Sequence, residues 1–400
     1  MEKNIEQTQT TPINVALLVC LVGFPQISET IYTPSLTEIA SSYHITLNVA
    51  QMTLSIYFLA FAFGVFFWGI SADYFGRRKA MTSGIFIYII GCLLCLISNS
   101  VGLLFLGRFV QAFGASTGSV TTQTILRDNY QGTQRHQLFA KISAALAFSP
   151  AIGPLVGGVI GQYQGFRGVF LALVLMGLAL LFWTLKSLPE TGNARSVNYG
   201  PQQILTIGKK MVKDPYTMAF GLLIGLFNGL LFSYHAEAPA IFIDTFKVSQ
   251  SQYGLMGCVV ASATVLGAWL SNRGLKHQSP EIMIERGIYL SLVGCLALTV
   301  VSLAPLFNLA LYISGIGVIL GGIGMALPNC LSLALTKFSD TAGTAGAFLS
   351  LGYYVIVSLC TFLIGIFHTG SLLLLPLFCL GLLILSLVCI KLAKRTISHS

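Results

Sequence analysis

Long apolar runs, separated by short polar segments, recur along the whole chain. Most runs hold about 18 to 25 residues, the length that an α-helix needs to cross roughly 30 Å of hydrocarbon. They differ from the alternating segments of about ten residues that form an outer-membrane β-barrel. The pattern therefore predicts an all-α membrane protein with twelve transmembrane helices, at residues 13–35, 49–71, 79–98, 101–124, 137–161, 166–186, 218–244, 251–272, 283–303, 306–335, 340–367 and 370–391.

The longest polar segment, between Ser187 and Pro215, divides these helices six and six. We predict an N-terminal six-helix bundle at 1–186, a cytoplasmic linker at 187–217 and a C-terminal six-helix bundle at 218–400. Gly69 and Gly267 each precede a basic loop, and Glu29 and Glu237 each stand shortly before a proline, at similar places in the two halves. Two pseudo-symmetric bundles with a site between them near mid-membrane are a transporter architecture.

Composition and charge agree with this interpretation. Hydrophobic residues make up 55% of the chain and charged residues 9%, against about 25% charged in an average soluble domain. The net charge of +9 comes from Lys and Arg at alternate helix ends, so it indicates topology and requires no nucleic-acid partner. We expect a multi-pass protein of the inner membrane, in contact with the lipid bilayer, with both termini in the cytoplasm. The polar start of the chain has no small-residue cleavage pattern, so the first helix is expected to be retained.

The nine cysteines lie in predicted helices, which places none for a disulfide between loops. Cys92 and Cys95 have the spacing of a metal or redox pair, but their apolar helix favours a packing role. The six histidines are scattered, and no nucleophile–base spacing recurs. We therefore expect no metal, no cofactor and no enzyme activity; a membrane-embedded enzyme or a receptor would need a polar cluster or a large soluble domain.

The loop "GISADYFGRRKAM" carries the most specific motif, formed by Gly69, Asp73, Gly76, Arg77 and Arg78. Glycines allow a tight turn and a close helix approach, and an acid beside two arginines can clamp neighbouring helix ends. The spacing resembles the G-x-x-x-D-x-x-G-R-[KR] signature of the major facilitator superfamily, which implies that family's fold and an inner gate at this loop. The corresponding second-half loop has Ser271 in place of the acid, so the gate is expected to be asymmetric.

The predicted fifth helix contains "AFSPAIGPLVGG", with Pro150, Gly153, Pro154, Gly157 and Gly158. Small residues permit close helix packing, and prolines bend a helix. The segment is similar to the G-P-x-x-G-G motif of the antiporters of this superfamily; taken alone it is also compatible with a simple packing face. "LPET" and "GFRGVF", at the two ends of the sixth helix, also resemble drug/proton antiporters.

Arg108 lies within the predicted fourth helix, with Gln111 three residues later on the same face. An arginine inside the membrane costs about 2.5 to 3.5 kcal/mol on insertion scales, so it must face a cavity or a partner. In the resembling family this arginine is associated with proton coupling. A structural role, tying this helix to backbone carbonyls of the first helix, is an alternative compatible with the former.

Glu29 is the only charged side chain between Val15 and Leu36. A carboxylate there is expected to face the central cavity, where it can hold a proton or a cationic group. The chain looks closest to the Bcr/CflA multidrug exporters, whose first helix has an Asp four residues before a proline. Thr30 occupies that position here, one residue or about 100° away from Glu29, so Glu237 is a second candidate, modestly behind Glu29, for part of the Asp's role. Either acid has the structural alternative of pairing with Arg108 or His235.

Further polar and aromatic side chains are candidates for lining the cavity: Tyr32, Tyr57, Gln111, Asn228, Tyr234, His235, Tyr353 and Tyr354. Each also fits a site between helices or at the membrane interface. Together these features predict a monomeric proton-coupled antiporter that expels a small amphipathic compound. A dedicated exporter of an endogenous metabolite such as a siderophore is the alternative, and a proton-symport importer would share the loop motif but not the fifth-helix motif.

Overall fold

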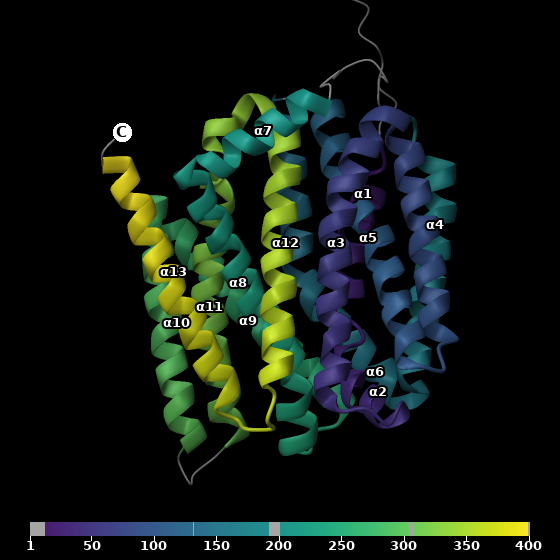
Figure 1. Cartoon of the computed structure of the whole chain (residues 1–400), viewed down its shortest axis with the longest axis vertical. Coiled ribbons are helices and arrows are strands. Elements are labelled where there is room, and N and C mark those ends of the chain that lie inside the picture. Colours follow the sequence, from purple (N-terminus) through teal and green to yellow (C-terminus); the bar gives the residue numbers. More distant parts are fainter. Residues whose placement is uncertain (1–12, 131, 192–200, 304–307, 399–400) are drawn as a thin grey trace, which may run out of the picture.

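Figure 1 shows two groups of long helices side by side, with α3 and α12 adjacent where the groups meet. This computed structural model describes residues 13–130, 132–191, 201–303 and 308–398, and within these ranges every regular element is helical. The first group contains α1 (Val15–Thr30), α2 (Leu36–Ser42), α3 (Leu47–Phe75), α4 (Arg77–Leu96), α5 (Val101–Asn129) and α6 (Gly132–Ser187). The second contains α8 (Pro215–Pro239), α9 (Gln250–Gly274), α10 (Pro280–Leu303), α11 (Leu309–Leu333), α12 (Ala342–Phe367) and α13 (Leu374–Ser398).

The predicted fold class is confirmed. α6 is two predicted helices in sequence, because Gly165 breaks its helical geometry with φ of 68°, a conformation that glycine adopts without strain. Counting its two parts separately gives 12 long helices in the described ranges. Ten segments of the described chain are long and apolar enough to span a membrane. α5 is not among them; it carries Arg108, Gln111 and several buried Ser and Thr residues.

Three local elements of the structure were not predicted from the sequence. α1 ends at Thr30, and a 3₁₀ turn at Thr33–Ser35 leads into α2, so the loop predicted after the first helix contains a helix of its own. A π-helix at Ala240–Thr245 follows Pro239, which cannot donate a backbone hydrogen bond. The predicted linker contains the amphipathic helix α7 (Pro201–Lys213), whose apolar residues Ile207 and Met211 pack beside α12.

The packing repeats between the groups. α4 packs on α5 and α3 on α5 in the first, as α10 packs on α11 and α9 on α11 in the second. Two seams join the groups: α3 against α12, and α6 against α9. The buried core includes residues from both halves, so the candidate site lies along a packed boundary.

Candidate functional site

Arg108 is completely buried in α5. Its guanidinium lies between two tyrosine rings, 3.9 Å from the ring centre of Tyr32 and 4.2 Å from that of Tyr57. Its Nη1 donates to Gln111 Oε1 at 2.5 Å, which confirms that the two side chains share a face. Aromatic faces stabilise a desolvated guanidinium by about 2 kcal/mol or more. The alternative role, in which Arg108 bonds backbone carbonyls of the first helix, does not fit this arrangement. In the described chain no Arg108 nitrogen bonds to an α1 carbonyl, and the two tyrosine rings are its neighbours instead.

The same guanidinium has free donors. Within the described residues, Nε and Nη2 of Arg108 are buried and have no hydrogen-bond partner. Gln111 is occupied on its other side, because its amide donates to Cys92 Sγ at 3.1 Å. A buried cation with two donor nitrogens that lack partners is costly unless another group satisfies them. The arrangement is therefore suited to receiving an acceptor.

Glu29 lies in the last turn of α1, with 3% of its surface exposed. Its Oε1 has no hydrogen-bond partner in the described part of the chain. No ion pair within 4.0 Å among the described residues joins it to Arg108 or His235, yet it interacts electrostatically with Arg108. The acid and the arginine are thus near each other without being directly paired.

The Glu29 carboxylate also faces the second half of the molecule. It interacts electrostatically with Tyr57 of α3 and with Tyr353 and Tyr354 of α12. The ring centres of Tyr353 and Tyr354 are 4.5 Å apart. The structure therefore brings Glu29 and three of the predicted tyrosines together at one boundary between the halves.

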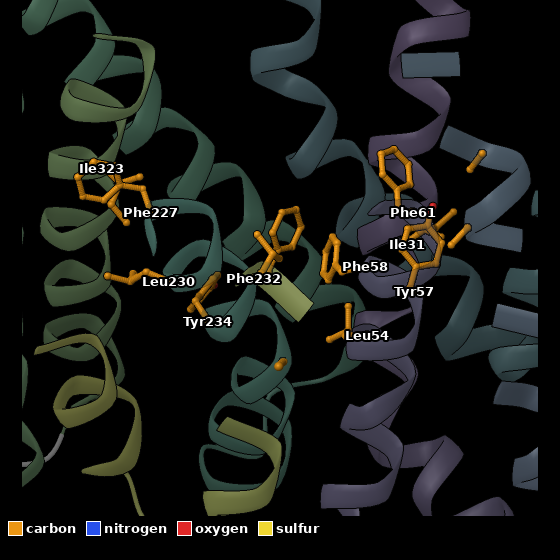
Figure 2. Packing of buried hydrophobic residues seen from close by; sticks show 14 of the residues in the cluster. Ile31, Leu54, Tyr57, Phe58, Phe61, Phe227, Leu230, Phe232, Tyr234 and Ile323 are labelled. Carbon is orange, nitrogen blue, oxygen red and sulfur yellow. The ribbon is translucent and has the colours of Figure 1, made fainter. Parts of the chain in front are cut away.

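Aromatic rings close this boundary. Figure 2 shows Phe58 of α3 pointing toward Phe232 of α8. The ring centres of Phe58 and Phe232 are 4.3 Å apart, and those of Phe61 and Tyr354 are 4.6 Å apart. Rings at such distances contribute about 0.5 to 1.5 kcal/mol beyond their burial. Flat, apolar surfaces next to Glu29 and Arg108 suit an amphipathic ligand.

Glu237 belongs to a different group of side chains. Its Oε2 accepts from Gln51 Nε2 at 2.9 Å, and its Oε1 lies 2.7 Å from His368 Nδ1. Gln51 and His368 were not predicted as site residues. Gln51 could have been identified from the sequence as a single amide within an apolar helix. His368 stands at the end of a helix and could not be distinguished from an ordinary loop residue.

The other α8 candidates do not join either acid. Asn228 donates to the Ile224 carbonyl of its own helix at 2.9 Å. His235 is buried, and neither ring nitrogen has a hydrogen-bond partner within the described chain. Its ring lies 5.1 Å from that of Tyr234, which is also buried. Tyr234 and His235 are thus buried in α8 away from both acids, and Asn228 is half-buried.

The inner-loop motif forms an ion-pair cluster. Arg77 binds Asp73 and Asp128 at 2.9 Å each and donates to the Ala72 carbonyl. The backbone N–H groups of Arg77 and Arg78 donate to Glu190 Oε1 at 2.7 and 3.3 Å. An acid at a helix N-terminus is stabilised by the free N–H groups and the dipole. The acid of "LPET" therefore ties the end of α6 to the start of α4, beside Gly76 with φ of 94°.

The motif of α6 lies against two other helices. A Cβ at Gly153 or Gly157 would collide with Thr30 or the Ile31 carbonyl, at the end of α1. A Cβ at Gly158 would collide with the Gln250 carbonyl of α9, and Gly254 of α9 sits on the Pro154 carbonyl. The side chain of Pro150 lies outside the described residues. The described part of the motif forms the α6–α9 seam and packs beside Glu29.

Residues 18–356 match the sequence profile described as Major Facilitator Superfamily. The chain belongs to this superfamily. It is 32% identical to an uncharacterized transporter of Rickettsia felis over 89% of this chain and 90% of the relative. It is 26% identical to multidrug resistance protein D of Escherichia coli K12, over 87% and 88% of the two chains.

Its fold is similar to the crystal structure of a bacterial homologue of the human lysosomal transporter Spinster. The TM-score is 0.75, the identity is 15%, and 96% of each chain is covered. As a member of a transporter family, the chain is expected to act on a small-molecule substrate across a lipid bilayer. In the described residues, no three His, Cys, Asp or Glu side chains are grouped as a metal site would require.

Proposed function

We propose that this major facilitator protein is a proton-coupled antiporter that exports small amphipathic compounds by alternating access. The observation that carries the proposal is that Glu29 and Arg108 are buried near each other at the boundary between the halves, and that among the described residues they form no ion pair and keep polar atoms without partners. A carboxylate in such a place is stabilised by taking up a proton or a cationic group. Because each lowers the affinity for the other, proton entry favours cargo release.

The α6 motif and the drug-resistance relative support export rather than import. The proton gradient would be the sole energy source, with no cofactor, in a monomer of the inner membrane with both termini in the cytoplasm. α7 and the C-terminal end of α13 lie at the same end of the molecule (Figure 1). The lysines and arginines of these segments support a cytoplasmic location for that end. Reporter fusions after Lys79 and Lys394 are expected to be cytoplasmic and one after Ser42 periplasmic; a cytoplasmic Ser42 fusion would invert the topology.

Purified protein in proteoliposomes tests the coupling. An acidic lumen, with the membrane potential clamped by valinomycin and potassium, should drive uptake of ethidium and of the neutral drug chloramphenicol. Glu29→Gln keeps the size and polarity of the side chain but removes the titrating group, so uphill uptake of both should stop. Glu285→Gln, which alters an acid that pairs with Lys394, is the matched control. Continued accumulation of chloramphenicol by Glu29→Gln would refute the proton role, and selective loss of ethidium would assign Glu29 to cargo recognition instead.

A dedicated exporter of an endogenous compound such as a siderophore is the second candidate. The one-residue shift of the acid from the multidrug pattern, with Thr30 in its usual place, favours it. Metabolite profiling of the medium of a deletion strain, beside a drug-susceptibility panel, separates the two. A single metabolite missing from the medium with unchanged susceptibility would identify the dedicated exporter.

A further inference from the structure

Glu237 is held by residues from both halves of the protein. Gln51, in the first turns of α3, donates to the Glu237 carboxylate and also to the Ala236 carbonyl, at 2.9 and 3.0 Å. His368, directly after α12, lies 2.7 Å from the other carboxylate oxygen. With 1% of Glu237 exposed, these bonds form in a dry environment, where charge-assisted hydrogen bonds are strong.

A second amide strengthens the same junction. Asn48, one turn before Gln51, donates to the carbonyls of Gly365 and His368 at 2.8 and 3.1 Å. One end of α3 is thereby bonded to both α8 and α12. This is the end that the charge pattern predicts to face outward.

We propose that Gln51, Glu237 and His368 form a latch that closes the outer end of the α3–α12 seam, and that proton uptake by the Glu237–His368 pair strengthens it. The inference rests on the proposed alternating-access function, in which this end must open and close. It assigns Glu237 to the gate and leaves Glu29 as the acid next to the cargo.

The surrounding charges support proton sensitivity. The hydrogen bond to Glu237 raises the pKa of His368 despite its partial burial, and Asp244 of the π-helix acts in the same direction. Lys247 lies near Asp244, and Tyr312 of α11 near Glu237. When the latch opens, His368 loses Glu237, and its pKa returns toward about 6.5. Protonation therefore favours the closed latch, and this contribution is lost as the pH rises through the raised pKa of the closed form.

At the same predicted outer end, the α6–α9 seam is joined by other bonds than a histidine–acid pair in the described residues. There Gln250 Nε2 bonds Glu38 at 3.3 Å, and the Ser251 N–H bonds Gln162 at 3.2 Å. Glu38 also accepts from the Phe166 N–H of its own half. In the described residues this seam holds no histidine–acid pair, so pH dependence near neutrality is expected to arise at the latch.

Distances between spin labels on the full chain in nanodiscs test the latch without any transport assay. Cys20→Ser and Cys258→Ser remove the two exposed thiols, and labels are placed at the exposed outer residues Ser42 and Thr369. A short distance should dominate at about pH 5.5, and a longer one should grow as the pH rises through the pKa of His368. If this change does not occur, the proton-sensing part is refuted.

Three variants isolate the parts. His368→Gln should remove most of the pH dependence, whereas His277→Gln, at the other end of the molecule, should retain it. Gln51→Leu should increase the open-to-closed ratio on the order of tenfold at every pH and keep the pH dependence. An unchanged distance distribution in Gln51→Leu, or an unchanged pH dependence in His368→Gln, would overturn the proposal. Because no substrate is used, a failed coupling test at Glu29 would not produce either result.

Discussion

The two halves each carry one acid shortly before a proline, and the structure gives these acids opposite surroundings. Among the described residues, Glu29 has an oxygen without a hydrogen-bond partner, and the nearby Arg108 forms no ion pair with it. Glu237 has both oxygens bonded, one to each half of the molecule. An unsatisfied buried group is costly and persists where a ligand or proton can satisfy it, whereas a satisfied one stabilises a particular arrangement.

The comparison shows how a duplicated fold can separate two tasks. The repeat keeps the backbone position, but the partners come from neighbouring helices, and these differ between halves. α5 supplies Arg108 beside Glu29, while α3 and the end of α12 supply Gln51 and His368 around Glu237. Binding and gating are thus expected to respond to different substitutions.

The largest effect on transport is expected for Glu29→Gln, when its uphill uptake and its exchange are compared with those of Glu237→Gln. Glu29→Gln should reduce uphill uptake to the level of protein-free liposomes and leave substrate-driven exchange nearly intact, because exchange needs no proton release. Glu237→Gln should slow uphill uptake and exchange alike, on the order of fivefold, because both need the outer end to close. Paired uptake and counterflow assays on the same preparations give the two ratios. Preserved exchange in Glu237→Gln would break the distinction between the acids.

Arg108→Lys should lower uphill uptake on the order of tenfold or more. Lysine keeps the charge but not the flat guanidinium that lies between two rings and bonds Gln111. Arg167→Lys, which alters an arginine bonded to Asn99 near the surface, serves as the control and should behave like the unaltered protein. Equal activity of the two variants would mean that charge alone suffices at position 108.

At the inner loop, Asp73→Asn should slow transport severalfold with little change in ligand affinity. Arg77 loses one ion pair but keeps Asp128 and the Ala72 carbonyl. Asp73 lies 16 residues after Tyr57 on α3, or roughly 24 Å along the helix, so the ligand contacts should be little affected. The second half has a neutral bond here, from Asn329 to Ser271 at 2.7 Å, so Ser271→Ala should have a smaller effect. Binding measured by ligand-induced fluorescence quenching, beside exchange rates, checks this; equal losses of affinity and rate in Asp73→Asn would contradict it.

The smallest effect is expected at the ion pair of Lys337 with Asp214. Partial burial raises the pKa of Asp214, but hydrogen bonds from Lys337 and Thr217 outweigh it, so this pKa lies below its ordinary value. The stabilisation is present near neutrality and is lost as the pH falls through the lowered pKa. Lys337→Met should lower the free energy of unfolding by less than about 1 kcal/mol at pH 7, seen as a slightly lower melting temperature, and the decrease should become smaller as the pH falls below about 4. A drop of equal size at both values would point to packing of the lysine stem.

The sequence predicted the helices well because each apolar run reports its own environment. Arg108 and Gln111 could be placed on one face by spacing alone, and the structure bonds them. Partners from distant segments could not be predicted in this way. His368 becomes a partner of Glu237 only through the packing of α12 on α8, and the helix in the linker was missed because its polar face dominated its composition.

α12 connects two separate regions of the molecule, the linker helix α7 and the latch at His368. Its 26 residues form a rod of about 39 Å, so pivoting it by about 5° about its middle moves each end by roughly 1.7 Å. Near one end Phe348 packs against α7 at Gly208, and the other end leads directly into His368. A displacement of that size is enough to break a hydrogen bond of 2.7 Å, while the rings near the pivot, Tyr353 and Tyr354, barely move. We therefore expect α12 to act as a lever, so that a movement of the linker helix α7 near one end of α12 would open or close the latch at the other end.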